Sequence, residues 1–241
     1  MESTFVLFGP AHVTVLILTV AIPVVLTAWV KYSRSTTLDS RIALTLGTIL
    51  LLNEGFSFFW KWHLGIIGWH NGLPMHLCDW ATFTTAITCL WRQRWSYELS
   101  YFWGLAGTLQ AVITPDLRYG FPEPSFFIFF LSHSGLVATI LYLTFAFPLR
   151  PTWASIPRAY GWLLFYAACA GVVDWLLGVN YGYLRAKPAG ASLLDYFGPW
   201  PWYIPVTTLL ALAFFVIYYL PFAVIDAIRQ CRSRQSGMSE T

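Results

Sequence analysis

The sequence predicts an all-α, polytopic membrane protein built as a bundle of seven transmembrane helices. Three observations support this prediction: the composition, the long apolar segments and the uneven placement of the basic residues. Of the 241 residues, 57% are hydrophobic and only 10% are charged, whereas soluble domains carry about 25% charged residues. Because so few charges cannot hydrate the surface of a soluble protein, the composition excludes a soluble enzyme, a disordered chain and a nucleic-acid-binding protein.

Seven segments are long and apolar enough to span a bilayer, which requires roughly 20 apolar residues per helix. The fourth segment is the weakest, because it is short and contains Gly104, Gly107 and Gln110. The segments take up most of the chain, so we expect a single transmembrane domain over residues 1–241. The expected spans are residues 5–30, 42–62, 73–91, 97–114, 125–148, 158–180 and 201–228.

The basic residues predict an N-terminus outside and a C-terminus inside. In this orientation ten of the fourteen Lys and Arg residues lie inside and four lie outside. All of the loops are short, which is the condition under which the positive-inside rule works best. The inside residues are Lys31, Arg34, Arg41, Arg92, Arg94, Arg150, Arg158, Arg229, Arg232 and Arg234, and the outside residues are Lys61, Arg118, Arg185 and Lys187.

Strongly polar residues lie at one depth in six of the seven expected spans, if each residue rises about 1.5 Å along the helix. This depth is the outer half of the membrane, and the inner halves are nearly free of ionisable groups apart from Asp226. Ionisable residues inside a membrane are costly and are therefore functional candidates. We expect one polar cavity open to the outer side; the alternative is a set of interfacial caps that reach water separately. The residues at this depth are His12, Asn53, Glu54, His76, Cys78, Asp79, Gln110, His133, Asp174 and Asn180.

The densest polar group is the string LPMHLCDW at residues 73–80. His76 and Asp79 are three residues apart and share a helix face, whereas Cys78 points onto a stripe of small and polar residues. Such stripes often pack against a neighbouring helix in membranes, so one interpretation of Cys78 is a packed small residue. The other interpretation is a nucleophile, because a thiolate is strongly nucleophilic and an imidazole can activate it.

The nucleophile hypothesis takes its base from His133, which lies at a similar depth on another span. Asp79, Glu54 or Asp174 would orient that histidine, with His76 and Asn180 as further polar neighbours. A Cys/His pair in the outer leaflet suits acyl transfer through a thioester formed from a lipid ester. Backbone N–H groups at the start of the third span, or the side chains of Gln110 and Asn53, would stabilise the oxyanion.

A metal site and a transport pathway are alternative interpretations of the same residues. His76, Asp79 and His133, together with Cys78, are suitable ligands for Zn²⁺, but no HxxxH or CxxC spacing is present, and we expect no cofactor. Buried acids and His133 would suit a proton relay, although the inner half offers no matching polar path. A retinal-linked photoreceptor is excluded, because the seventh span contains no lysine for a Schiff base.

Two loops on the expected outer side carry charged residues that would contact a lipid head group. Asp116 and Arg118 lie in residues 114–124, and Arg185 and Lys187 lie in residues 180–202. Pairing between Asp116 and Arg118, or simple solvation of the loops, would explain the same charges. Both loops lie on the side where the cavity opens, and together they would form its roof.

Four segments resemble the YwaF family of bacterial integral membrane proteins. They are LPMHLCDW (73–80), YFWGLAGTLQAVITPDLRYGFP (101–122), the region of His133, and NYGYLRAKPAGASLLDYFGPWPWYI (180–204). This family is similar to the eukaryotic transmembrane protein 164 group, which is associated with acyl transfer onto ether lysophospholipids. The resemblance implies that Cys78 is the acyl acceptor and that His133 is its partner.

The sequence thus leads to a membrane lipid acyltransferase or acyl hydrolase that uses Cys78 and His133. Its expected partners are a membrane phospholipid or lysophospholipid and no nucleic acid. Its expected location is the plasma membrane, which is the bacterial cytoplasmic membrane if the YwaF resemblance holds. The alternative is a non-catalytic membrane protein that binds or transports a small solute, an ion or a metal through the same cavity.

Overall fold

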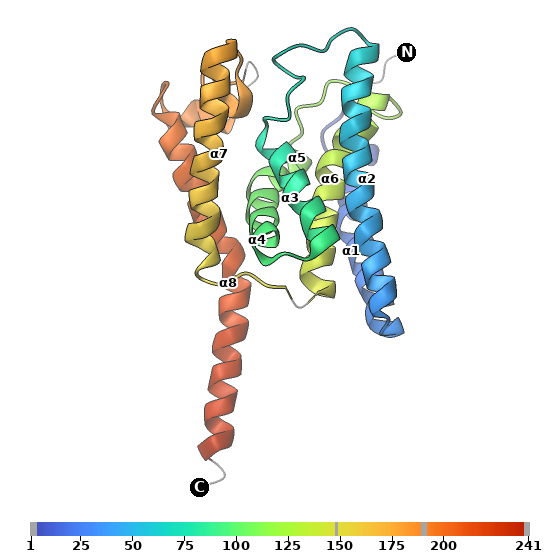
Figure 1. Cartoon of the computed structure of the whole chain (residues 1–241), viewed down its shortest axis with the longest axis vertical. Coiled ribbons are helices and arrows are strands. Elements are labelled where there is room, and N and C mark those ends of the chain that lie inside the picture. The colour runs from blue at the N-terminus through green and yellow to red at the C-terminus, as the bar shows by residue number, and fades with distance from the viewer. Residues whose placement is uncertain (1–3, 148, 189–191, 239–241) are drawn as a thin grey trace.

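The computed structural model describes residues 4–147, 149–188 and 192–238, with side chains as far as Cys231. Its regular structure is helical, which confirms the all-α class, and the long helices run along one axis (Figure 1). The α4, η1 and α5 elements follow one another without a break and form one rod. The helical elements are α1 (Pro10–Ser33), α2 (Thr36–His63), α3 (Leu77–Trp91), α4 (Arg94–Trp103), η1 (Gly104–Thr108), α5 (Leu109–Ile113), α6 (Pro124–Ala146), α7 (Ser155–Leu177), η2 (Tyr181–Tyr183), η3 (Leu193–Phe197) and α8 (Tyr203–Met238).

The helices begin and end at residues with a local reason to start or stop them. Pro10 and Pro124 open α1 and α6, where the missing N–H costs nothing. The Ser35 hydroxyl accepts the Leu38 N–H at the start of α2. Gly178 ends α7 with a φ of 70°, a left-handed conformation that glycine adopts without strain.

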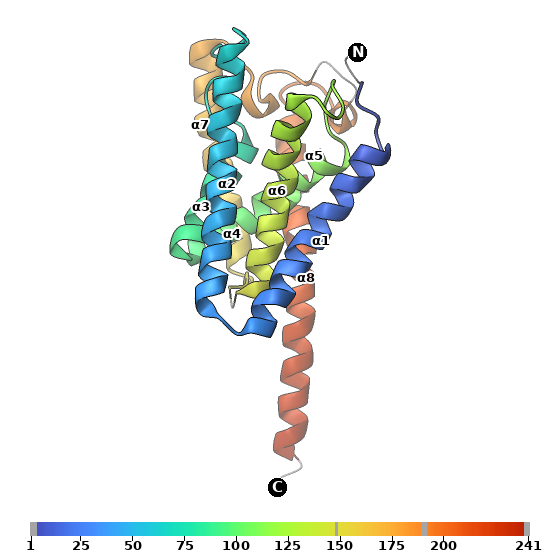
Figure 2. The same ribbon diagram turned by 90° about the vertical axis from the view of Figure 1, so that its right-hand side faces the viewer.

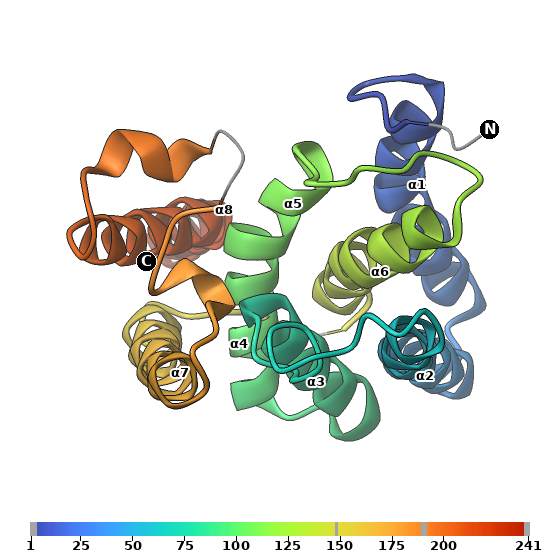
Figure 3. The ribbon, with the colours of Figure 1, turned by 90° about the horizontal axis from the view of Figure 1, so that it is seen from above.

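Within the described part of the chain, five helices are long and apolar enough to cross a membrane: α1, α2, α6, α7 and α8. The third expected span is shorter than predicted, because α3 has only 15 residues. At about 1.5 Å per residue it is roughly 22 Å long, less than the ~30 Å hydrocarbon core. Figures 1 and 3 place α3 and the α4–α5 rod between the α7/α8 pair and the group formed by α1, α2 and α6, and Figure 2 shows the molecule from the side of α1, α2 and α6.

The α4–α5 rod, the weakest of the expected spans, forms the centre of the bundle. Every residue from Ser96 to Trp103 is buried. The Trp103 indole donates to the Ala159 carbonyl of α7 at 3.2 Å, and the Tyr101 hydroxyl donates to the Tyr218 carbonyl of α8 at 2.9 Å. Gly104 lies against Ile140 of α6, with no room for a Cβ atom. The polar and small residues that weaken the hydropathy signal therefore make the contacts of the core.

The expected inner end of the bundle contains ion pairs that the sequence analysis missed when it singled out Asp226. Glu98 is 2% exposed, and its carboxylate accepts from Arg158 at 2.6 Å, Ser155 at 2.7 Å and Arg94 at 3.1 Å. Arg94 lies one turn before Glu98 at the start of α4, and Ser155 and Arg158 lie in the first turn of α7. Neighbouring pairs join Arg92 to Asp39 at 3.2 Å and Arg150 to Asp226 at 2.7 Å. The side chains of Arg232 and Arg234 lie outside the described ones.

Replacing the Glu98 carboxylate should destabilise the bundle. Glu98→Gln places an amide donor against the two guanidinium groups, so we expect a loss of about 1–3 kcal/mol. The matched control is Asp226→Asn, because the side chain of Asp226 is 42% exposed and such a pair contributes about 0–1 kcal/mol. Thermal unfolding of the two variants in the same detergent measures the difference. Equal melting temperatures for Glu98→Gln and the wild type would contradict the stabilising role of the Glu98 carboxylate.

Candidate functional site

A cavity of about 640 Å³ lies between α2, α3 and α6. It lies toward the end of the bundle where α2 finishes and α6 begins, and Leu117, Tyr119 and Glu123 of the loop between α5 and α6 contribute to its lining. This part of the expected roof is therefore present. The cavity brings together five of the predicted site residues from three helices and the coil before α3. Its ionisable, thiol and hydroxyl residues are Glu54, Ser57, Lys61, His76, Cys78, Asp79, Thr82, Tyr119, Glu123, Ser125, Ser132 and His133.

Cys78 is the second residue of α3 and is fixed by the start of that helix. The Asp79 carboxylate accepts the His76 backbone N–H at 2.8 Å, which closes the first turn. The Cys78 Sγ lies 3.7 Å from Asp79 Oδ1, so its S–H donates toward that carboxylate. Cys78 is half-buried and lines the cavity, whereas Cys89, further along the expected stripe, is buried against Gly47. The stripe therefore packs at its inner end and faces the cavity at its outer end.

His133 is held in one tautomer by a backbone carbonyl. Its Nδ1 lies 2.8 Å from the Phe129 carbonyl oxygen, which can only accept, so Nδ1 carries the hydrogen. In the neutral ring, Nε2 then keeps its lone pair. The imidazole stacks on the Phe129 ring at a centroid distance of 4.2 Å and interacts electrostatically with Asp79 and His76. This arrangement leaves a basic nitrogen on a ring with a fixed orientation.

Asn53 and Glu54 are joined to α6 through Ser132. The Asn53 amide donates to the Ile128 carbonyl at 3.1 Å and to Ser132 Oγ at 2.7 Å. The Ser132 hydroxyl in turn donates to Glu54 Oε1 at 3.4 Å. Both donor contacts of Asn53 serve this link, so Asn53 ties α2 to α6 and does not serve as the expected oxyanion donor.

The expectation of one cavity is wrong for five of the ten residues at the expected depth, namely Asn53 and the four that follow. Gln110 lines a different cavity. Asp174 is completely buried and accepts the Tyr181 N–H at 2.7 Å, while the Asn180 carboxamide oxygen accepts the Arg185 N–H at 3.0 Å. His12 Nε2 lies 2.9 Å from the Val112 carbonyl oxygen. These side chains fix turns and helix contacts because, at the same depth, they point to other sides of their helices.

The charged residues of the outer loops contact the protein itself. The Arg185 guanidinium donates to the Asp174 carbonyl at 3.0 Å, and the Lys187 ammonium lies 5.6 Å from the centre of the Tyr203 ring. The Arg118 guanidinium lies over the ring of the adjacent Tyr119. Asp116 is exposed, and the ion pairs found among the described side chains do not include one between Asp116 and Arg118. A head-group role for these residues stays a prediction.

Seven polar residues of the cavity were not predicted as site residues, among them Ser132, Lys61 and Glu123. Ser132 adjoins His133 in the sequence, and this position was the one signal that could have found it. Lys61, counted only as a topology signal, donates to the Asn71 carbonyl at 3.1 Å and lines the cavity, as does Glu123. Among the described residues, no three His, Cys, Asp or Glu side chains converge on a point where a metal ion would bind. The possible metal site at His76, Asp79 and His133 is therefore not formed.

Five candidate membrane helices and a cavity with a thiol, imidazoles and carboxylates at one end define an integral membrane protein with a candidate reaction site. Comparison with known proteins then identifies its family. The chain belongs to the TMEM164 family, whose model matches residues 7–219. This confirms the relation to the transmembrane protein 164 group, and the YwaF likeness stays a resemblance.

One relative is an uncharacterized protein of Treponema pallidum (strain Nichols), which is 27% identical over 154 residues. The aligned region covers 64% of this chain and 63% of the relative. The chain therefore spans less than two thirds of that relative's length. No solved structure matches the chain.

Proposed function

We propose that this protein is a membrane lipid acyltransferase or acyl hydrolase in which Cys78 is the nucleophile and His133 is the general base. The observation that carries the proposal is that both side chains line one cavity, with the basic Nε2 of His133 kept available by the bond at Nδ1. The family resemblance of these two residues points to the same pair. The cavity opens among membrane helices, so a lipid ester is the substrate class within its reach.

The first half-reaction transfers an acyl group to the thiol. His133 Nε2 takes the proton of Cys78, and the sulfur attacks the carbonyl carbon of a lipid ester. The tetrahedral intermediate then collapses with cleavage of the ester C–O bond. The departing lysolipid oxygen takes the proton from His133, which leaves an acyl thioester on Cys78 and restores the neutral imidazole.

The second half-reaction removes the acyl group. His133 takes a proton from the hydroxyl of an acceptor lysophospholipid, or from water, and the oxygen attacks the thioester carbonyl. Collapse of this intermediate releases the Cys78 sulfur, which recovers the proton from His133. An alcohol acceptor gives transfer and water gives hydrolysis, so access of water to the cavity decides between the two outcomes.

The first turn of α3 provides the electrostatic support for both intermediates. The first N–H groups of a helix have no partner within the helix, and here they belong to the turn that contains Leu77 and Cys78. We propose that the Cys78 N–H of this turn donates to an oxyanion formed next to the sulfur. Asp79, whose carboxylate accepts from Cys78 and from His76, positions the thiol.

Substitution of the proposed pair should separate catalysis from folding. In proteoliposomes with a labelled phospholipid, we expect Cys78→Ala to abolish acyl release and transfer. His133→Gln should lower the rate by about 10²–10⁴-fold, because it removes the general base. The matched control is Cys169→Ala, a half-buried cysteine on α7, which should keep full activity. Wild-type rates in a correctly folded Cys78→Ala protein would contradict the mechanism.

We further propose that seven helical segments cross the bacterial cytoplasmic membrane with the N-terminus outside. These segments are α1, α2, α3, the α4–α5 rod, α6, α7 and α8. The support is the placement of the basic residues and the position of α3 and α4–α5 among the five longer helices. A membrane-impermeant maleimide should label Tyr196→Cys in intact cells, because Tyr196 is 85% exposed in the outer loop. It should label the exposed Cys231 only after permeabilisation. Labelling of Cys231 in intact cells, and of Tyr196→Cys only after permeabilisation, would show that the topology is the reverse of the one proposed.

A further inference from the structure

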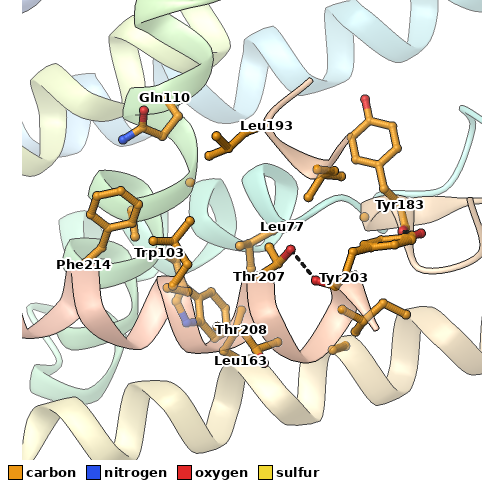
Figure 4. Close-up of a pocket in the computed structure, with 18 of the residues that line it drawn as sticks. Leu77, Trp103, Gln110, Leu163, Tyr183, Leu193, Tyr203, Thr207, Thr208 and Phe214 are labelled. Carbon is orange, nitrogen blue, oxygen red and sulfur yellow. Dashed lines mark hydrogen bonds between the residues drawn. The ribbon is translucent and has the colours of Figure 1, made fainter. Parts of the chain in front are cut away.

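A second cavity, of about 410 Å³, lies between α7, α8 and the α4–α5 rod. Figure 4 shows Leu163, Leu193 and Phe214 around it, with Leu77 of α3 in its wall. Most of its surface is hydrocarbon, and this apolar cavity is separate from the polar cavity that contains Cys78.

The polar atoms around the apolar cavity are largely engaged already. The Thr207 hydroxyl donates to the Tyr203 carbonyl at 2.7 Å, the dashed bond in Figure 4. The Tyr203 hydroxyl donates to the Tyr183 carbonyl, and the Trp103 indole donates to Ala159. Water needs two to four polar partners to occupy a buried site, and these groups already donate their hydrogens to carbonyl oxygens of the protein. The cavity therefore favours an apolar occupant.

The position of the apolar cavity indicates what that occupant is. Two of its walls, α7 and α8, are helices long and apolar enough to cross a membrane. On α8 the lining extends from Tyr203 to Phe215, which is roughly 18 Å of helix at about 1.5 Å per residue. An elongated apolar space at this depth borders the lipid hydrocarbon. The apolar molecules that surround it are the acyl chains of the membrane.

The apolar cavity reaches to within one residue of Cys78. Leu77 lines the apolar cavity, and the next residue, Cys78, lines the polar one. Tyr166 also lines the apolar cavity. The Tyr166 hydroxyl donates to the Met75 carbonyl at 3.0 Å, so this tyrosine contacts the coil just before α3. The first turn of α3 is the partition between the two cavities.

A π-helical segment supplies the opposite wall. The η1 element, Gly104–Thr108, interrupts the α-helical rod, and such segments are rare and frequently occur at functional sites. Gly104 is packed against Ile140 of α6, which fixes one side of the segment. Ala106 and Gly107 line the apolar cavity, and a Cβ on Gly107 would meet Leu77 at 3.5 Å. The small side chains leave the space that the cavity occupies.

We propose that the apolar cavity binds the acyl chain of the lipid whose ester reaches Cys78, and that Ala106 and Gly107 set the chain length it accepts. The identification of the lipid as the substrate rests on the proposed function, whereas chain binding in the cavity does not. The scissile ester lies at the start of α3, with its chain along α8 and its head group on the side of the polar cavity.

The first test maps the chain directly. The protein is reconstituted with a phosphatidylcholine whose hexadecanoyl chain ends in a diazirine, irradiated, and analysed by peptide mass spectrometry. We expect crosslinks in the peptides that contain residues 103–110 and 203–215. Ala106→Phe should reduce them by about tenfold, because filling an apolar pocket costs on this scale. The matched control is Ala168→Phe, an exposed position on α7, which should leave them unchanged.

The second test measures chain length at Cys78. Loading of the thiol from phosphatidylcholines with hexadecanoyl or butanoyl chains is compared in Gly107→Leu and in Gly161→Leu, where a Cβ meets nothing within 4 Å. Gly107→Leu should lower loading of the long chain by about tenfold and spare the short chain, while Gly161→Leu resembles the wild type. Crosslinks confined to the outer faces of the bundle, or an unchanged preference in Gly107→Leu, overturn the inference.

The two tests also separate this inference from the proposed function. Loading of Cys78 without crosslinks in the apolar cavity overturns the inference and leaves the reaction intact. Crosslinks in the cavity with no loading of Cys78 from either phospholipid support the chain site and overturn the reaction at Cys78.

Discussion

The structure depends on one constraint of a membrane: a polar group away from water must find its partner within the protein. Glu98 meets this constraint through two arginines and a serine where α4 and α7 begin. Asp174 Oδ1 meets it by holding the turn at Tyr181, whereas Asp174 Oδ2 has no hydrogen-bond partner among the described residues, and His12 meets it through the Val112 carbonyl. Each of these pairings fixes the position of a helix or a turn.

The residues of the polar cavity differ from these structural pairs because they keep reactive atoms free, namely the Cys78 sulfur and the His133 Nε2. Asp79 closes the first turn of α3 and also receives the Cys78 S–H, so the thiol is oriented without being enclosed. His133 uses Nδ1 for its own helix and presents Nε2. A thiol, a basic nitrogen and the N-terminus of a helix thus line one space. This combination is the physical basis of the proposed thioester chemistry, and the apolar cavity across the first turn of α3 extends it to the substrate's chain.

Much of the fold follows from the sequence, because apolar length and helix start signals need no knowledge of neighbouring segments. The sequence also predicts Cys78, Asp79 and His133 at one level, since depth can be counted along each helix. The direction in which a side chain points depends on how the helices pack. For this reason Gln110, Asp174 and Asn180 lie at the expected depth and face other surroundings. The central position of α4–α5 was missed for a related reason. Hydropathy detects helices whose apolar side chains face lipid, and a helix that is surrounded by other helices does not need such side chains.

The central claim is that Cys78 carries the acyl group during turnover. Purified wild-type protein is incubated with a phospholipid that has one labelled acyl chain, quenched in acid during turnover and digested. Mass spectrometry of the peptide that contains Cys78 should then detect the acyl mass, and neutral hydroxylamine should remove it, as expected for a thioester. Turnover with an unmodified Cys78, or with the acyl group on another residue, would contradict the account.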